Sequence, residues 1–145
     1  MEYINRRNIN RGYMKLEVWN HAIDLLALVN EIIKSIRRID PRLKSQILDA
    51  TQSISSNIAE GYCRRTINEY LQYLNVSLGS SGESMTRMVG LKKLRLISED
   101  QFESFDKLHF EMENKLLALV ASLQKKRKEG TWEEELKEPQ TTYLQ

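Results

Sequence analysis

Histidine and carboxylate side chains are the first candidates for chemistry, because helical proteins can hold a pair of metal ions between their helices. Such a centre needs two Glu-x-x-His motifs and two further inward carboxylates. The chain has two histidines, and Asp106-Lys107-Leu108-His109 is the one approximate match. His21 follows Val18 at the spacing where a second motif would need a carboxylate. The spacing therefore predicts no metal site and no cofactor, and makes His109 a polar residue bordering the core.

Cys63 is the second candidate, since it stands beside Arg64 and Arg65. Neighbouring positive charge is one way in which proteins lower the pKa of a reactive thiol. A nucleophile also needs a base, and no histidine lies near Cys63 in the sequence. Walker-type, dinucleotide-binding and serine-hydrolase motifs are absent as well. We therefore expect a partly buried thiol and a protein that is not an enzyme.

Clusters of basic residues are the remaining candidates, and they lie beside the predicted turns. The candidates for phosphate contact are Arg37, Arg38, Arg42, Lys44, Arg64, Arg65, Lys92, Lys93 and Arg95. The first four and the last three should meet at one end of an antiparallel bundle and face phosphates there. Basic residues also favour helix C-termini because they complement the helix dipole, and this plainer explanation stays open. Without an aromatic platform, contact would be with the nucleic-acid backbone.

The elements that must position these residues are four long amphipathic helices. Apolar spacing and start and stop signals place them at about residues 16–39, 42–60, 66–94 and 98–128. Short connections make the expected fold all-α, an antiparallel up-down-up-down four-helix bundle. Gly61 is expected to cap the second helix in a left-handed conformation, and Leu78, Met85 and Val89 to face inward from the third.

Some apolar residues exceed what one such core requires. The apolar arc of the first helix covers nearly half its circumference, and Phe110 and Leu117 project away from the inward face of the fourth. The small residues from Gly79 to Gly82 would allow close approach of another backbone, or mark a bend. These features predict a second buried contact.

Composition divides the chain into a core and two flanks. Residues 1–14 read as a flexible basic arm, 15–128 as the bundle and 129–145 as an acidic mobile tail with five Glu and one Lys. Cys63 is the only cysteine, which predicts a reducing, cytoplasmic location. No apolar run is long enough for a membrane span.

Several motifs follow one another in a characteristic order. They are Leu16-Glu17-Val18-Trp19, then Ser53-Ile54-Ser55-Ser56-Asn57-Ile58-Ala59-Glu60-Gly61-Tyr62, then Glu69-Tyr70-Leu71-Gln72-Tyr73-Leu74 and Leu78-Gly79-Ser80. In these motifs the chain resembles the proteins encoded in intervening sequences of bacterial 23S ribosomal RNA genes, over about residues 15–127. Ser56, Asn57, Ala59, Glu60 and Gly61 form the most specific part, for which a structural role is expected.

The resemblance implies a cytoplasmic four-helix bundle that assembles as a homopentameric ring and binds RNA. Relatives include the accessory variability determinant of diversity-generating retroelements, which works with a reverse transcriptase. Arg64 and Arg65 match basic residues that usually follow the glycine turn. The chain departs from the family at Ile47-Leu48-Asp49-Ala50, where arginines are common. Two hypotheses stay open: an RNA-binding homo-oligomer, and a scaffold whose basic surface binds an acidic protein.

Overall fold

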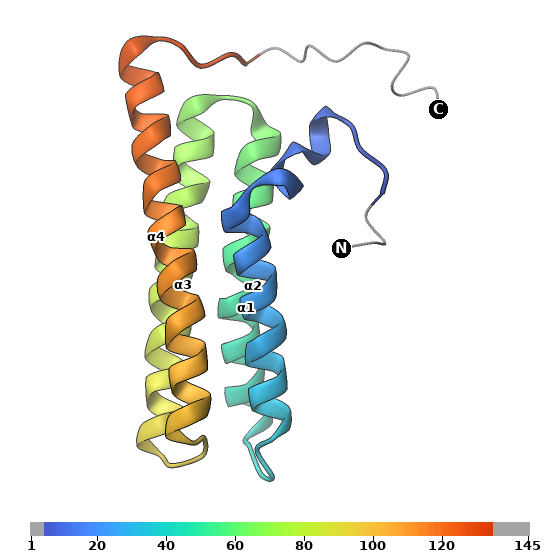
Figure 1. Cartoon of the computed structure of the whole chain (residues 1–145), viewed down its shortest axis with the longest axis vertical. Helices are drawn as coiled ribbons and strands as arrows, with labels where there is room; N and C mark the ends of the chain where they lie inside the picture. Colours follow the sequence, from blue (N-terminus) through green and yellow to red (C-terminus); the bar gives the residue numbers. More distant parts are fainter. Residues whose placement is uncertain (1–4, 135–145) are drawn as a thin grey trace.

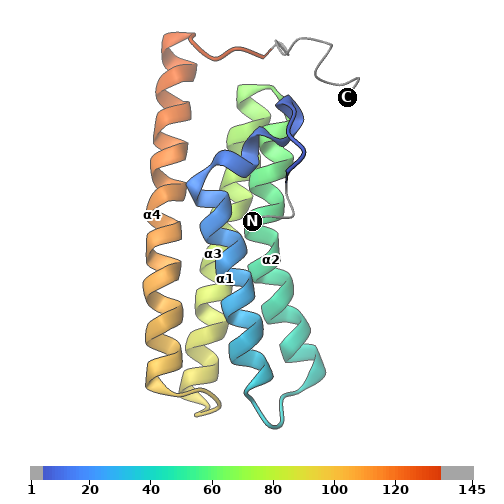
Figure 2. The ribbon, with the colours of Figure 1, turned by 45° about the vertical axis from the view of Figure 1, so that its right-hand side comes forward.

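The computed structural model describes residues 5–134, which contain four α-helices, one 3-10 helix and no β-strand. In chain order these are the 3-10 helix η1 (Ile9–Lys15), α1 (Glu17–Lys34), α2 (Pro41–Arg64), α3 (Ile67–Lys93) and α4 (Glu99–Glu129). The four long helices lie side by side (Figures 1 and 2). The α1–α2 and α3–α4 connections lie at one end of the molecule, and the α2–α3 connection and η1 lie at the other. The prediction of an all-helical fold is confirmed.

Side-chain caps fix where the helices begin. Asp40 accepts hydrogen bonds from the backbone N–H groups of Arg42 (2.8 Å) and Leu43 (3.2 Å) at the start of α2. Ser98 and Gln101 form a reciprocal capping box at the start of α4. The predicted starts near residues 66 and 98 are thus confirmed by cap geometry, since Thr66 also accepts a bond from the Glu69 N–H (3.3 Å).

Gly61 does not cap α2, and that prediction is wrong. It is buried inside the helix, and an added Cβ would lie 2.7 Å from the Cβ of Tyr73 and 3.2 Å from the Tyr70 carbonyl oxygen. The residue therefore serves a close approach between α2 and α3. The helix continues to Arg64, and Arg65 takes the left-handed conformation at φ 72°.

The inward face of α3 is more polar than the sequence suggested. Ser77, Ser81 and Ser84 are buried, whereas Val89 is 43% exposed, so its predicted inward position is wrong. The Ser77 hydroxyl donates to the Ile54 carbonyl oxygen (2.9 Å), and the Ser84 and Thr51 hydroxyl groups lie 2.8 Å apart. Small hydroxyl side chains let α2 and α3 pack closely while every hydroxyl keeps a partner.

Gly79 and Gly82 make no close contact with the described part of their own chain. An added Cβ would have no neighbouring atom within 4 Å at either position. The expected close approach of another backbone is therefore not made inside one protomer. α3 is continuous through both glycines.

Residues of the predicted basic arm form part of the packed structure. η1 packs against α1 and α2, and the Asn20 side chain donates to the Met14 carbonyl oxygen at its end (2.9 Å). The Tyr13 ring lies 5.4 Å from Trp19 and 6.1 Å from Tyr62. Contacts between aromatic rings thus hold the segment 9–15 on the helices. Residues 1–4 of the arm and 135–145 of the predicted tail lie outside the described residues.

The two kinds of helical glycine predict opposite responses to alanine. Gly61→Ala should lower the free energy of unfolding by about 1–3 kcal/mol, because the new methyl group meets backbone and Cβ atoms of α3. Gly79→Ala, the control, should raise it by about 1 kcal/mol in a monomer, since alanine favours the helix and the space is empty. Urea unfolding followed by circular dichroism measures both. Equal effects of the two substitutions would contradict the close α2–α3 contact.

Candidate nucleic-acid interface

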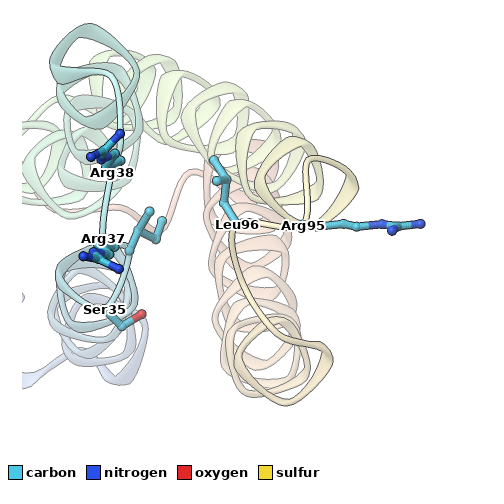
Figure 3. A pocket seen from close by; sticks show the side chains of 6 residues that line it. Ser35, Arg37, Arg38, Arg95 and Leu96 are labelled. Atoms are coloured by element: carbon cyan, nitrogen blue, oxygen red, sulfur yellow. The ribbon is translucent and has the colours of Figure 1, made fainter.

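The structure brings two of the predicted basic clusters together, at what we call the basic end (residues 35–44 and 92–96). An open pocket of about 460 Å³ separates the α1–α2 and α3–α4 connections there. Its lining comprises Ser35, Ile36, Arg37, Arg38, Arg95 and Leu96. Figure 3 shows Leu96 pointing into the space between the connections, while the Arg95 side chain points away from Arg37 and Arg38. The cations therefore spread across the end of the molecule.

Among the residues that the structure describes, most cations of the basic end have no acidic partner. Within residues 5–134, no carboxylate forms an ion pair with any of six of them, which are Arg37, Arg38, Arg42, Lys44, Lys93 and Arg95. Segments 34–44 and 92–100 together carry eight Lys or Arg against three Asp or Glu. Phosphate groups could approach these side chains without first displacing an internal carboxylate.

Lys92 is the exception in this group. Its ammonium nitrogen lies 3.1 Å from a Glu99 carboxylate oxygen and 4.7 Å from the centre of the Phe102 ring. Because both contacts join the end of α3 to the start of α4, we assign Lys92 a structural role at the basic end.

Arg95 occupies a backbone conformation that normally favours glycine. Its φ is 60°, and it follows α3 in a Schellman turn, with Arg95 N–H donating to the Lys92 carbonyl and Leu96 N–H to that of Leu91 (both 3.0 Å). The equivalent position after α4 is Gly130, at φ 69°. An arginine in this conformation is strained by its Cβ, as Arg65 is at φ 72° after α2.

Ser35 and Gln101 hold the two connections together, and spacing alone did not identify them. The Gln101 amide donates to the Ser35 hydroxyl oxygen (2.8 Å), which links the end of α1 to the first turn of α4. The only signal in the sequence was the role of Gln101 in the capping box. The pair lies beside the pocket that Arg37, Arg38 and Arg95 line.

Arg64 and Arg65 lie at the opposite end, beside the α2–α3 connection (Figure 1). The Arg64 guanidinium lies 3.2 Å from Glu60 and 3.6 Å from Glu69, and the hydrogen bond to Glu60 raises its pKa. Arg65 donates to the Ile9 carbonyl oxygen (2.9 Å) and lies over the Tyr62 ring. Both guanidinium groups are thus engaged inside the chain.

The other motif residues make contacts within the helices. The Asn57 side-chain amide donates to the backbone oxygen (2.7 Å) and the hydroxyl oxygen (2.9 Å) of Ser53, and Ser53 also accepts from the Ser80 hydroxyl (2.8 Å). Ser56 is exposed and Ala59 is half-buried. The bonds of Asn57 thus stay within α2, and Ser53 carries the link to α3 through Ser80.

His109 and Cys63, the two candidates for chemistry, pack against other residues of the chain. His109 is buried, with Nε2 2.9 Å from the Ser81 carbonyl oxygen and 3.0 Å from its hydroxyl oxygen. Burial raises the pKa of Cys63, whose thiol donates to the Asn10 carbonyl oxygen (3.3 Å). The described residues contain no group of three or more His, Cys, Asp or Glu side chains that could hold a metal ion. Among the same residues, no helix combines the length and apolarity of a membrane span.

Comparison with known families identifies the family of the chain. The family model described as 23S rRNA-intervening sequence protein matches residues 14–118, which include the basic end and the whole α2–α3 contact. The chain belongs to this family. Comparison with curated proteins gives no match.

The departure from the family pattern in α2 coincides with the core. Ile47 and Ala50 are buried, and Leu48 packs partly against them, so only Asp49 of this segment is exposed. Basic charge near this end of α2 therefore comes from Arg42 and Lys44 in its first turn. Residues 9–13 of η1 and the segment after α4 fall outside the matched residues.

The substitution Arg95→Gly removes a positive charge from the basic end and should at the same time make the fold more stable. Glycine relieves the left-handed backbone, so we expect the free energy of unfolding to rise by about 1 kcal/mol. Arg65→Gly is the comparison, because it relieves the same strain but also removes the bond to Ile9 and the contact with Tyr62. The free energy of unfolding should therefore rise less for Arg65→Gly than for Arg95→Gly, or should fall. Thermal melting of the three proteins measures the difference, and a loss at Arg95→Gly would contradict the strain.

Proposed function

We propose that the chain is a non-enzymatic, homo-oligomeric RNA-binding protein of the bacterial cytoplasm, and that RNA contacts its basic end. The observation that carries the proposal is the set of six cations there without an acidic partner in the described structure. Membership of the 23S rRNA-intervening sequence protein family is consistent with ribosomal RNA as the ligand. Arg64 and Arg65 contribute less, since they already bind internal partners.

Binding of this kind reads the backbone of the RNA more than its bases. No aromatic ring lines the pocket at Arg37 and Arg38, and the cations point in different directions across the end (Figure 3). Such a surface suits phosphates spaced along a structured RNA. Its affinity should fall steeply with salt, because binding releases counterions.

Arg37→Gln with Arg38→Gln should weaken binding to a structured ribosomal RNA fragment and lower the slope of log affinity against log salt by about two. The control is Lys107→Gln with Lys115→Gln, which removes two charges from the side of α4. Fluorescence anisotropy at several salt concentrations measures both. If the slope of log affinity against log salt falls equally in the two double variants, RNA binding depends only on the net charge of the protein. That result would contradict contact at the basic end.

We also propose that the four long helices form an antiparallel up-down-up-down bundle. In the described structure α1 contacts α2 and α4, and α3 contacts α2 and α4, whereas the diagonal pairs make no comparable contact. The helices are joined by the short connections 35–40, 65–66 and 94–98. In an antiparallel bundle the α1–α2 and α3–α4 connections lie at the same end. This arrangement brings the basic residues of the two connections together at the basic end.

Exposed apolar surface supports assembly into a homo-oligomer, a ring of five by the family resemblance. Phe110 is 60% and Leu117 50% exposed on the outside of α4. An apolar groove of about 380 Å³ runs between α1 and α2, where Ile23, Leu26 and Leu48 line it. We propose that α4 of one protomer packs into this groove of the next. Such a head-to-tail contact closes into a ring when its rotation allows.

Phe110→Ser with Leu117→Ser should reduce the molar mass in solution to that of the monomer. The two substitutions remove the exposed apolar side chains that α4 would bury in the next protomer. Size-exclusion chromatography with light scattering measures the molar mass. Leu94→Ser is the control, because Leu94 is 65% exposed but lies at the basic end. A wild-type protein that is monomeric at micromolar concentration would refute the assembly.

The second candidate is a scaffold or accessory factor for a nucleic-acid enzyme such as a reverse transcriptase. Val89 and Leu94 are exposed beside Lys93 and Arg95, and this mixture of apolar and basic groups suits an acidic protein surface. Pull-downs with and without ribonuclease distinguish the candidates. A partner retained after digestion of RNA favours the scaffold, and a partner lost favours RNA binding.

A further inference from the structure

The pocket at the basic end has an apolar part that contact with phosphates alone does not use. Ile36 lines it from the α1–α2 connection and Leu96 from the α3–α4 connection, and both side chains are half-buried. Leu96 points into the space between the connections (Figure 3). The pocket holds about 460 Å³, within the range of roughly 300–1,000 Å³ in which proteins bind small organic groups. A flat apolar group that covers Ile36 and Leu96 would remove them from water, which favours binding.

Donors for an anion lie directly beside this apolar lining. Arg37 and Arg38 follow Ile36, and neither guanidinium group forms an ion pair within residues 5–134. In the same part of the chain, no backbone carbonyl accepts a hydrogen bond from the N–H groups of Arg37, Arg38 or Ile39. Phosphate oxygens accept both from guanidinium groups and from successive backbone N–H groups. The pocket therefore offers an apolar surface and phosphate donors within a few residues of each other.

The neutral polar side chain of the lining is already engaged inside the chain. The Ser35 hydroxyl donates to the Ile32 carbonyl oxygen and accepts from the Gln101 amide (2.8 Å). A base in the pocket would therefore be held by contact with its face more than by hydrogen bonds to its edge. Binding of this kind tolerates different bases, because every base has a face.

We propose that the pocket takes one unpaired nucleotide of the bound RNA, with its phosphate at Arg37 and Arg38 and its base against Ile36 and Leu96. The inference rests on the proposed RNA binding, and names the feature of the RNA that the basic end recognises. In an A-form duplex the bases are stacked and paired, so only a loop, a bulge or an end can place a base in such a pocket. A nucleotide joins one anion to one flat ring, which is the combination that this lining complements.

Two RNAs with the same number of phosphates test the proposal on the full chain. One is a hairpin with an unpaired uridine loop, and the other is a blunt duplex in which every base is paired. Fluorescence anisotropy should show that the hairpin binds more tightly, by about threefold or more, because apolar contact adds to the phosphate contacts. Equal affinity for the two RNAs would refute the nucleotide pocket and leave RNA binding intact. If the chain binds neither RNA, both proposals fail.

Leu96→Ser removes part of the apolar lining and keeps every charge. The affinity for the hairpin should fall to that for the duplex, while the affinity for the duplex and the salt slope stay unchanged. Leu94→Ser is the matched control, because Leu94 belongs to the same connection, is 65% exposed and does not line the pocket. It should keep the preference for the hairpin. A preference that survives Leu96→Ser, or is lost equally in both variants, would overturn the proposal.

A measurement on the wild-type chain does not depend on the folding of these variants. A photoreactive thiouridine in the hairpin loop should crosslink to residues 35–38 or 95–96, as mapped by mass spectrometry, and crosslinks confined to other segments would refute the pocket. Circular dichroism shows whether Leu96→Ser retains its helices, since Leu96 packs partly against the core. A glutamate-rich peptide containing leucine is the last probe. If it binds the wild-type chain more tightly than the hairpin does and loses that affinity with Leu96→Ser, the pocket serves a protein and the proposal is wrong.

Discussion

The close approach of α2 and α3 is the constraint on which the rest of the molecule depends. Gly61 leaves no room for a side chain against α3, and buried serines replace the larger residues that an apolar face would carry. Hydroxyl groups on both helices then pair with each other and with backbone carbonyl oxygens. This contact fixes the α2–α3 connection at one end, and the neighbouring helices α1 and α4 pack beside it.

The two ends of the molecule use arginine differently. At the end that carries the α2–α3 connection, Arg64 and Arg65 bind carboxylates, a backbone oxygen and tyrosine rings. At the basic end, Arg37 and Arg38 have no such partners in the described structure, and Arg95 retains a strained backbone. An engaged arginine stabilises the fold, whereas an exposed one lowers the electrostatic cost of approach for a polyanion. This difference is the basis for our proposal that RNA meets the basic end and not the end that carries Arg64 and Arg65.

Sequence reasoning found the helices because their caps and apolar periods are strong local signals, as at Ser98 and Gln101. It misplaced the inner face of α3, because buried Ser81 and Ser84 look like surface residues until their hydrogen bonds are known. It also read Gly61 as a helix end, because glycine serves both at helix ends and at close helix contacts, and the sequence alone does not distinguish the two. Of the site, it predicted the shared end of two clusters but not the internal partners of Arg64 and Arg65.

The central claim is that RNA meets the basic end. Backbone amide chemical shifts of the labelled full chain, recorded during titration with a structured ribosomal RNA fragment, test it most directly. We predict that the largest salt-sensitive changes fall in residues 35–44 and 92–96. Changes confined to the α2–α3 connection and the sides of the helices, or no changes at a saturating RNA concentration, would contradict the claim.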